Sequence, residues 1–180
     1  MKIYFFVLSL LLFSCSNPKD TQKVEVLSPP TTPTAAPRGV QKLLRNIMGT
    51  GGGLVRGVQF GDAISDVKSK EKAELFEEEE THIGYTFDTD SFETVDILYE
   101  KDKQNRVSGI ELDIYMNSDV SNDSLKNEIA KQFTTRFGNP LDTTNSTWQI
   151  KPNGRVTIKV VKNKLDRGLE IKFIKNSEAI

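Results

Sequence analysis

The chain contains very little cysteine, histidine and tryptophan, with one residue of each among 180. A single cysteine excludes an intramolecular disulfide, so the stability of the fold must come from its hydrophobic core. Charge of one sign is also lacking, because 24 Lys and Arg residues face 25 Asp and Glu residues. This balance is not the basic footprint of a nucleic-acid-binding protein, and we expect no nucleic-acid partner.

The most prominent apolar run lies at the amino terminus and is too short to span a bilayer. It extends from Ile3 to Phe13, interrupted only by Ser9, and follows the positively charged Lys2. A bilayer span needs about 20 apolar residues. A charged start, an apolar stretch of about ten residues and small residues at a cut site are instead typical of a secretory signal. Residues 1–14 are therefore predicted to be a signal peptide.

The segment Leu12-Phe13-Ser14-Cys15 resembles the lipobox of bacterial lipoproteins, with Leu three positions before the cysteine and a small residue directly before it. The resemblance implies cleavage before Cys15, a diacylglyceryl group on its thiol and acylation of the new amino terminus. Two or three acyl chains anchor a protein stably, so we expect the mature chain on a membrane of the cell envelope. Lipid on the only thiol also excludes thiolate catalysis.

The residues after the cysteine refine this expectation. Ser16 and Asn17 follow, with no aspartate directly after Cys15. This resembles retention in the outer membrane and implies a position facing the periplasm. Residues 15–40 are rich in Pro and Thr, which favours an extended tether.

Residues 41–61 are predicted to be a short helix followed by a glycine-rich hinge. Leu43, Leu44 and Ile47 would lie on one side of a helix that ends at the cluster Gly49–Gly53. The cluster lacks the Lys and Ser or Thr of a phosphate-binding loop, and no strand precedes it. We therefore expect a hinge and no bound nucleotide.

Residues 62–180 are predicted to form one α+β domain. A first helix is expected from about 62 to 71, with Asp62 as its N-cap, and a second from about 121 or 123 to 137. In the second helix Leu125, Ile129 and Phe133 repeat every fourth residue, which predicts an apolar stripe facing a core. Gly138-Asn139-Pro140 should end it.

Strands are predicted where apolar and polar residues alternate, whereas residues 74–81 are ambiguous between helix and strand. The expected strands are 83–87, 95–99, 110–116, 147–150, 156–160 and 169–173. This pattern predicts a mainly antiparallel sheet of about six strands with two helices on one face. The order also allows two halves, each with one helix and three strands.

Two short motifs resemble a known group of modules. Phe60-Gly61-Asp62-Ala63-Ile64-Ser65-Asp66-Val67 is similar to the start of the helix in small outer-membrane-assembly lipoproteins and beta-lactamase-inhibitor-protein-like modules. Phe137-Gly138-Asn139-Pro140 is similar to their helix-ending Gly-x-Pro, although here it follows the second helix. Those modules are mostly protein-binding scaffolds, which implies a similar role.

No combination of residues predicts catalysis or metal binding. His82 is the only histidine, and nothing in the sequence places Ser91 or Ser108 beside it as a nucleophile. The segment Asp88–Glu93 lacks the third oxygen ligand and the glycine of a calcium loop. We expect no catalytic site, no metal and no cofactor.

Charge is distributed unevenly along the chain. Residues 62–100 hold thirteen acids and three bases, whereas residues 150–175 hold eight bases and two acids. Arg155, Lys159 and Lys172 should lie on an exposed basic sheet face, which is either simply solvated or a docking surface for an acidic partner or anionic lipid. Ser124 and Thr143 each follow an Asp, which resembles the O-glycosylation acceptor of exported proteins in Bacteroidetes-type bacteria.

The leading hypothesis is a non-enzymatic envelope lipoprotein that acts as a protein-interaction module. The alternatives are a periplasmic protein that binds a small ligand or an envelope polymer, and an inhibitor or immunity protein. The sequence leaves the partner, the oligomeric state and the use of Ser124 and Thr143 open.

Overall fold

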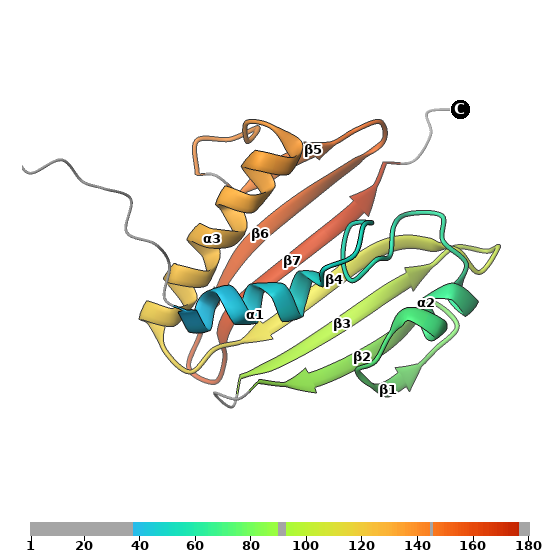
Figure 1. Cartoon of the computed structure of the whole chain (residues 1–180), viewed down its shortest axis with the longest axis horizontal. Coiled ribbons are helices and arrows are strands. Elements are labelled where there is room, and N and C mark those ends of the chain that lie inside the picture. The colour runs from blue at the N-terminus through green and yellow to red at the C-terminus, as the bar shows by residue number, and fades with distance from the viewer. Residues whose placement is uncertain (1–37, 90–92, 145, 177–180) are drawn as a thin grey trace, which may run out of the picture. The chain divides into compact units, whose positions relative to one another are not determined.

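The computed structural model describes residues 38–89, 93–144 and 146–176. They form a seven-stranded antiparallel sheet with three helices on one of its faces, which is an open α+β architecture (Figure 1). Cys15, the signal peptide and the tether up to residue 37 lie outside the described residues, so their predictions stay predictions. The predicted end of the tether at residue 40 is wrong, because a helix already begins at Arg38.

The sheet is built from two groups of sequential strands that meet at one central pairing. Its order is β1-β2-β3-β4-β7-β6-β5, and every pair of neighbours is antiparallel. The strands are β1 Glu74–Glu78, β2 His82–Asp88, β3 Thr94–Lys101, β4 Val107–Tyr115, β5 Thr147–Ile150, β6 Gly154–Lys162 and β7 Arg167–Lys175. The pairing of β4 with β7 joins the two groups into one sheet.

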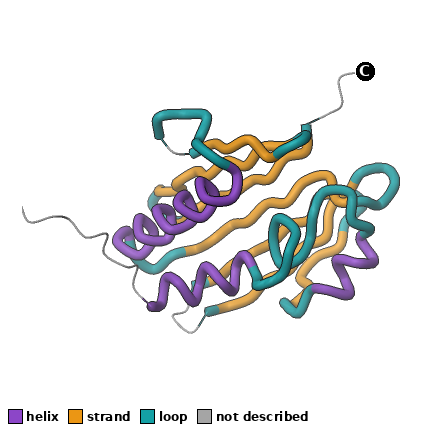
Figure 2. Tube along the Cα trace, turned by 45° about the horizontal axis from the view of Figure 1, so that its top comes forward, coloured by secondary structure: helices purple, strands orange, loops and turns teal. Residues whose placement is uncertain are grey.

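The helices supply the second layer. They are α1 Arg38–Met48, α2 Ile64–Lys70 and α3 Asp119–Phe137. Figures 1 and 2 show α1 and α3 crossing the same face of the sheet, with α2 near its β1 edge. The strands alternate accordingly, because one side chain in two is buried beneath the helices and the next lies on the opposite face.

The predicted α+β class and antiparallel sheet are confirmed, with seven strands where about six were predicted. A seventh strand, β1, forms in the ambiguous stretch, where consecutive glutamates and a register shift between Leu75 and Glu77 hide the alternation. The possible halves of three strands each are wrong, since four strands precede α3 and three follow it.

The helix boundaries also differ from the prediction. Asp62 is not the N-cap of α2, because Ala63 occupies that position without a side-chain hydrogen bond, and Asp62 pairs with Lys70 at 2.8 Å instead. Helix α3 starts at Asp119, earlier than expected, because Ser118 accepts a hydrogen bond from the Ser121 amide as the N-cap. Its predicted end is confirmed, since Gly138 is the C-cap with φ of 92°.

The core begins before residue 62, where we expected the domain to start. Helix α1 and the segment after it contribute buried side chains to the same hydrophobic cluster as the sheet, among them Ile47, Val55 and Val58. A methyl group on Gly53, whose φ is +78°, would lie 2.6 Å from the Val58 carbonyl oxygen. The predicted hinge is therefore a tightly packed turn within the compact unit.

Candidate functional site

The face of the sheet opposite the helices is covered by no described element, and we call it the uncovered face. Its side chains come from alternate positions of all seven strands and are mostly half-buried, as expected for the solvated side of an antiparallel sheet. The register of the strand pairs places residues that are far apart in the sequence side by side on this face. One such row runs across Thr86, Asp96, Asp113, Glu170 and Lys159.

Three neighbouring members of that row are acids. Asp96 of β3 lies directly opposite Asp113 of β4, and Asp113 directly opposite Glu170 of β7. Like charges directly opposite each other destabilise a sheet. With Glu111, which lies one row away on β4, these residues form a cluster that we call the acidic centre.

The acids of this centre differ in whether a lysine pairs with their carboxylate. Lys172 places its Nζ 2.9 Å from Glu111 and 3.5 Å from Glu170, and Lys159 lies 3.1 Å from Glu170. Among the described residues, Asp96 and Asp113 have no basic partner of this kind. Desolvation by partial burial and the nearby carboxylates of Glu111 and Glu170 raise the pKa of Asp113.

The predicted basic residues lie on this same face. Arg155 is exposed on β6, and Lys159 and Lys172 are the cations that pair with Glu170 and Glu111. Sequence reasoning missed these acids because they come from β4 and β7 and from outside the acid-rich stretch. The face is therefore mixed in charge, with an acidic middle and a basic side.

The acidic centre has the composition of a cation site but already contains a cation. Glu111, Asp113 and Glu170 each place one carboxylate oxygen within 4.8 Å of the others. The ammonium group of Lys172 lies against two of the three carboxylates. We assign no metal to this cluster, because a lysine already supplies positive charge there.

His82 and Ser108 line one depression on the uncovered face, but they do not form a nucleophile and base pair. The hollow, of about 430 Å³, is lined in addition by Leu98, Glu100 and other neighbours. The His82 ring nitrogens contact Thr81 at 3.0 Å and Glu77 at 2.7 Å, and neither contacts Ser108. Ser91 lies outside the described residues.

Apolar side chains also occur on this face, and one of them, Leu98 of β3, lies directly opposite Glu111. Phe76 of β1 lies over Gly84, whose missing Cβ leaves space for the ring, and it is 45% exposed. Tyr115 at the end of β4 is 42% exposed, and Leu98 is half-buried. Large apolar residues beside acidic ones are a feature that only the strand pairing could reveal.

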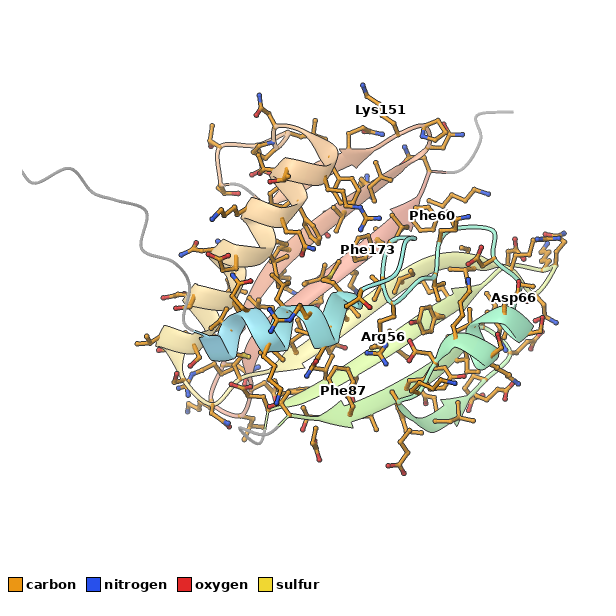
Figure 3. All side chains as sticks on the ribbon, viewed as in Figure 1. Arg56, Phe60, Asp66, Phe87, Lys151 and Phe173 are labelled. Atoms are coloured by element: carbon orange, nitrogen blue, oxygen red, sulfur yellow. The ribbon has the colours of Figure 1, made fainter. Side chains whose placement is uncertain are left out.

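A second polar cluster is buried and has a structural role. Arg56 Nε lies 2.9 Å from the Glu71 carboxylate, which is fully buried and also accepts a short hydrogen bond from the Tyr99 hydroxyl. The Arg56 guanidinium lies 5.3 Å from the centre of the Phe87 ring, and Figure 3 shows both residues on the helix-covered side. Burial, and then the Glu71 charge, raise the pKa of Tyr99. We call Arg56, Glu71 and Tyr99 the polar junction.

The proposed glycosylation positions have different surroundings. Ser124 lies within α3 and is half-buried, and Asp123 before it is not an N-cap. Thr143 is exposed in the loop before β5, where the Asp142 carboxylate accepts hydrogen bonds from Thr144 and Ser146. The hydroxyl of Thr144, and then the side chain of Thr147 and the Ser146 amide, lower the pKa of Asp142 to about 2.

None of the described helices is both long enough and apolar enough to span a membrane. Comparison of the chain with protein-family models, curated proteins and solved structures finds no match among any of the three.

Proposed function

We propose that this protein is a non-enzymatic lipoprotein of the cell envelope, held on a membrane through Cys15, and that its uncovered face binds another protein. The observation that carries the proposal is the acidic centre. Asp96 and Asp113 lie opposite each other, and neither forms an ion pair with a base among the described residues, an arrangement that opposes folding. Departures from the locally favourable choice are expected at functional sites.

The surroundings of the acidic centre fit a protein partner. Phe76 and Tyr115 supply partly exposed aromatic surface, and aromatic residues are enriched in interfaces. A Lys or Arg side chain of the partner would neutralise Asp96 and Asp113 and be desolvated between apolar contacts. The partner surface should therefore be basic at its middle, which differs from the acidic partner expected from the basic strand alone.

The anchor rests on the lipobox resemblance at Cys15 and is tested separately. We expect Cys15→Ala to abolish both cleavage of the signal and membrane association. The measurement is the mass of the purified chain and its distribution between membrane and soluble fractions. Unchanged processing and unchanged membrane association would contradict the anchor.

The interface is tested by affinity capture from native membranes, using wild-type protein and two double variants. Asp96→Asn/Asp113→Asn removes the unpaired charges, whereas Glu79→Gln/Glu80→Gln removes two exposed charges outside the acidic centre. We expect wild type and the control to recover the same partner, and the first variant to recover about tenfold less. Equal recovery by all three, or no specific partner, would count against the proposed face.

A small-ligand binder remains the second candidate, because the depression beside His82 measures about 430 Å³. That volume falls within the usual range of ligand pockets, about 300 to 1,000 Å³. Native mass spectrometry of protein released from membranes would show a retained ligand. We expect Leu98→Asp in this depression to abolish its retention.

A further inference from the structure

A groove between α1 and α3 lies on the face of the molecule that carries the helices. It encloses about 480 Å³ and has Leu44 and Met48 of α1 as its apolar floor. The two helices pack against each other, and Gln41 Nε2 donates to Glu128 at 2.8 Å, which joins them across the groove. The groove is thus built from two helices that the sequence separates widely.

The groove is bordered by positive charge. Arg45 of α1 and Lys131 of α3 are exposed at its walls, and among the described residues neither has an acidic partner. Arg136 also lines it and donates to the carbonyl oxygens of Gly53 and Leu54. Because these acceptors carry no net charge, the positive charge of Arg136 is not neutralised. Glu128 is the one acid in the lining, and its carboxylate accepts the hydrogen bond from Gln41.

The two faces of the molecule therefore differ in how their charges are arranged. Helix α1 contains three basic residues and no acidic residue, whereas the uncovered face has the acidic centre at its middle. A molecule with an uneven distribution of charge takes a preferred orientation at a charged surface.

We infer that the groove between α1 and α3 binds the phosphate-bearing headgroup of an anionic phospholipid in the membrane that holds the anchor. Arg45 and Lys131 would contact the phosphate from the two walls, and the floor of Leu44 and Met48 would meet the apolar part next to it. The domain would then rest on the bilayer by its helices and present the uncovered face to its partner. This inference rests on the proposed membrane anchor.

The connection to the anchor supports a lipid as the occupant. The chain from Cys15 enters the domain at α1, one of the two helices that form the groove. The 22 residues between Cys15 and Arg38 can extend to about 75 Å at most. This length lets the helix face reach the bilayer without forcing it there, so the charges decide the orientation. Each cation close to an anionic membrane should favour docking about fivefold.

The test measures orientation on vesicles. Because Cys15 is lipidated in the proposal, an introduced cysteine is the only free thiol and accepts a fluorophore. The label is placed at Asn46→Cys on α1 or at Thr157→Cys on the uncovered face. The lipidated protein is inserted into vesicles of phosphatidylcholine, with or without phosphatidylglycerol, that contain a lipid with a quencher at its headgroup.

We expect phosphatidylglycerol to increase quenching at residue 46 and to leave residue 157 weakly quenched. Arg45→Gln/Lys131→Gln should lower the docked-to-undocked ratio about 25-fold, from about fivefold for each cation. The matched control is Lys151→Gln/Lys164→Gln, two exposed cations in the turns after β5 and β6, and it should change little. Figure 3 labels Lys151 in its turn, away from α1.

A second control separates the groove from general attraction. Lys126 lies on α3 but does not line this groove, so Lys126→Gln should reduce docking less than Lys131→Gln. Equal losses for both, or equal quenching with and without phosphatidylglycerol, would overturn the headgroup site.

Failure of the anchor can be distinguished from failure of the groove. If mass spectrometry shows an unlipidated Cys15, the proposed anchor is wrong. The Cys15→Ser chain is then attached through an amino-terminal histidine tag to a chelating lipid. The same variants and the same quenching then test the groove by itself.

Discussion

The helix layer is attached to the sheet in two different ways. On one side Phe133 of α3 contacts Phe137, Trp148 and Phe173 with ring centres 5.4 to 5.6 Å apart, and we call these four residues the aromatic junction. On the other side the polar junction of Arg56, Glu71 and Tyr99 connects the glycine-rich turn and the end of α2 to β3. The first junction depends on burial and shape, and the second depends on complete pairing.

Helix length explains why the junctions differ. Helix α3 has 19 residues and buries Leu125, Ile129 and Phe133 along one stripe. Helix α2 has seven residues and buries only Ile64 and Val67 in this way. A short helix offers too little apolar surface to hold its end and the preceding turn in place. A buried ion pair with a tyrosine donor supplies specific contacts there, at the cost of desolvating the charges.

The largest effect should come from the aromatic junction. Phe133 is fully buried, so Phe133→Ala loses the transfer free energy of the ring and leaves a cavity against three other rings. We expect the free energy of unfolding to fall by about 4 kcal/mol. Urea unfolding followed by Trp148 fluorescence and by circular dichroism measures it. A loss below about 1 kcal/mol would show that the aromatic junction is not a main attachment.

At the polar junction, removal of the Glu71 carboxylate should lower the free energy of unfolding almost as much. Glu71→Ala leaves the Arg56 guanidinium without its counter-ion and the Tyr99 hydroxyl without its acceptor. We expect a loss of about 3 kcal/mol in urea unfolding. Glu78→Ala is the control, because its pair with Lys68 is exposed and screened by solvent and should contribute little. Equal losses for both variants would contradict a buried role for Glu71.

The glycine-rich turn next to the polar junction should tolerate no side chain at Gly53. Its φ of +78° and the close Val58 carbonyl predict that Gly53→Ala lowers the free energy of unfolding by about 2 kcal/mol. A methyl group on Gly52 meets nothing within 4 Å, so Gly52→Ala is a matched control. If both variants unfolded at the same urea concentration as the wild type, the turn would be the flexible hinge that we first expected.

The tyrosine of the polar junction should give an alkaline signature. Burial, and then Glu71, raise the pKa of Tyr99 above its ordinary value of about 10. Above pH 10 the unfolded chain loses a proton that the folded chain keeps, so stability falls as the pH rises. Tyr99→Phe should cost about 1.5 kcal/mol at pH 7 and flatten this alkaline decline. An unchanged slope in pH-dependent unfolding would contradict the assignment.

The smallest effect concerns the acidic centre, and here the substitution should raise the free energy of unfolding. Asp113→Asn should stabilise the protein by about 0.5 kcal/mol at pH 7, because it removes like-charge repulsion across the sheet. The pKa of Asp113 is raised in the fold, so the wild-type penalty disappears as the pH falls and both states become protonated. The gain should therefore vanish near pH 3. A destabilised variant at pH 7 would show that Asp113 has a partner.

The two junctions also differ in how well the sequence predicts them. The stripe of Leu125, Ile129 and Phe133 is visible as a repeat of four, so the helical half of the aromatic junction was predictable. Arg56, Glu71 and Tyr99 share no periodicity, and Tyr99 follows Glu71 by 28 residues along the chain. Nothing local indicates that an arginine in a glycine-rich turn will contact a glutamate beyond the next helix.

The candidate site on the uncovered face was also only partly predictable from the sequence. The alternation in β6 predicted that Arg155 and Lys159 share a face, and they do. It did not predict their neighbours, because those depend on the pairing of β7 with β4 and on its register. A shift of one residue would have turned Glu111 and Asp113 away from Lys172.

Local patterns alone established the class of the fold, the stripe of α3, its glycine cap and most of the strands, because periodicity of burial is a property of neighbouring residues. The tertiary structure alone decided that β1 is a strand, that the glycine-rich turn is packed, and that acids and bases meet on the uncovered face. The meeting of acids and bases depends on contacts between segments far apart in the chain, because β4 pairs with β7. Such contacts form only where the whole set of buried side chains fits together.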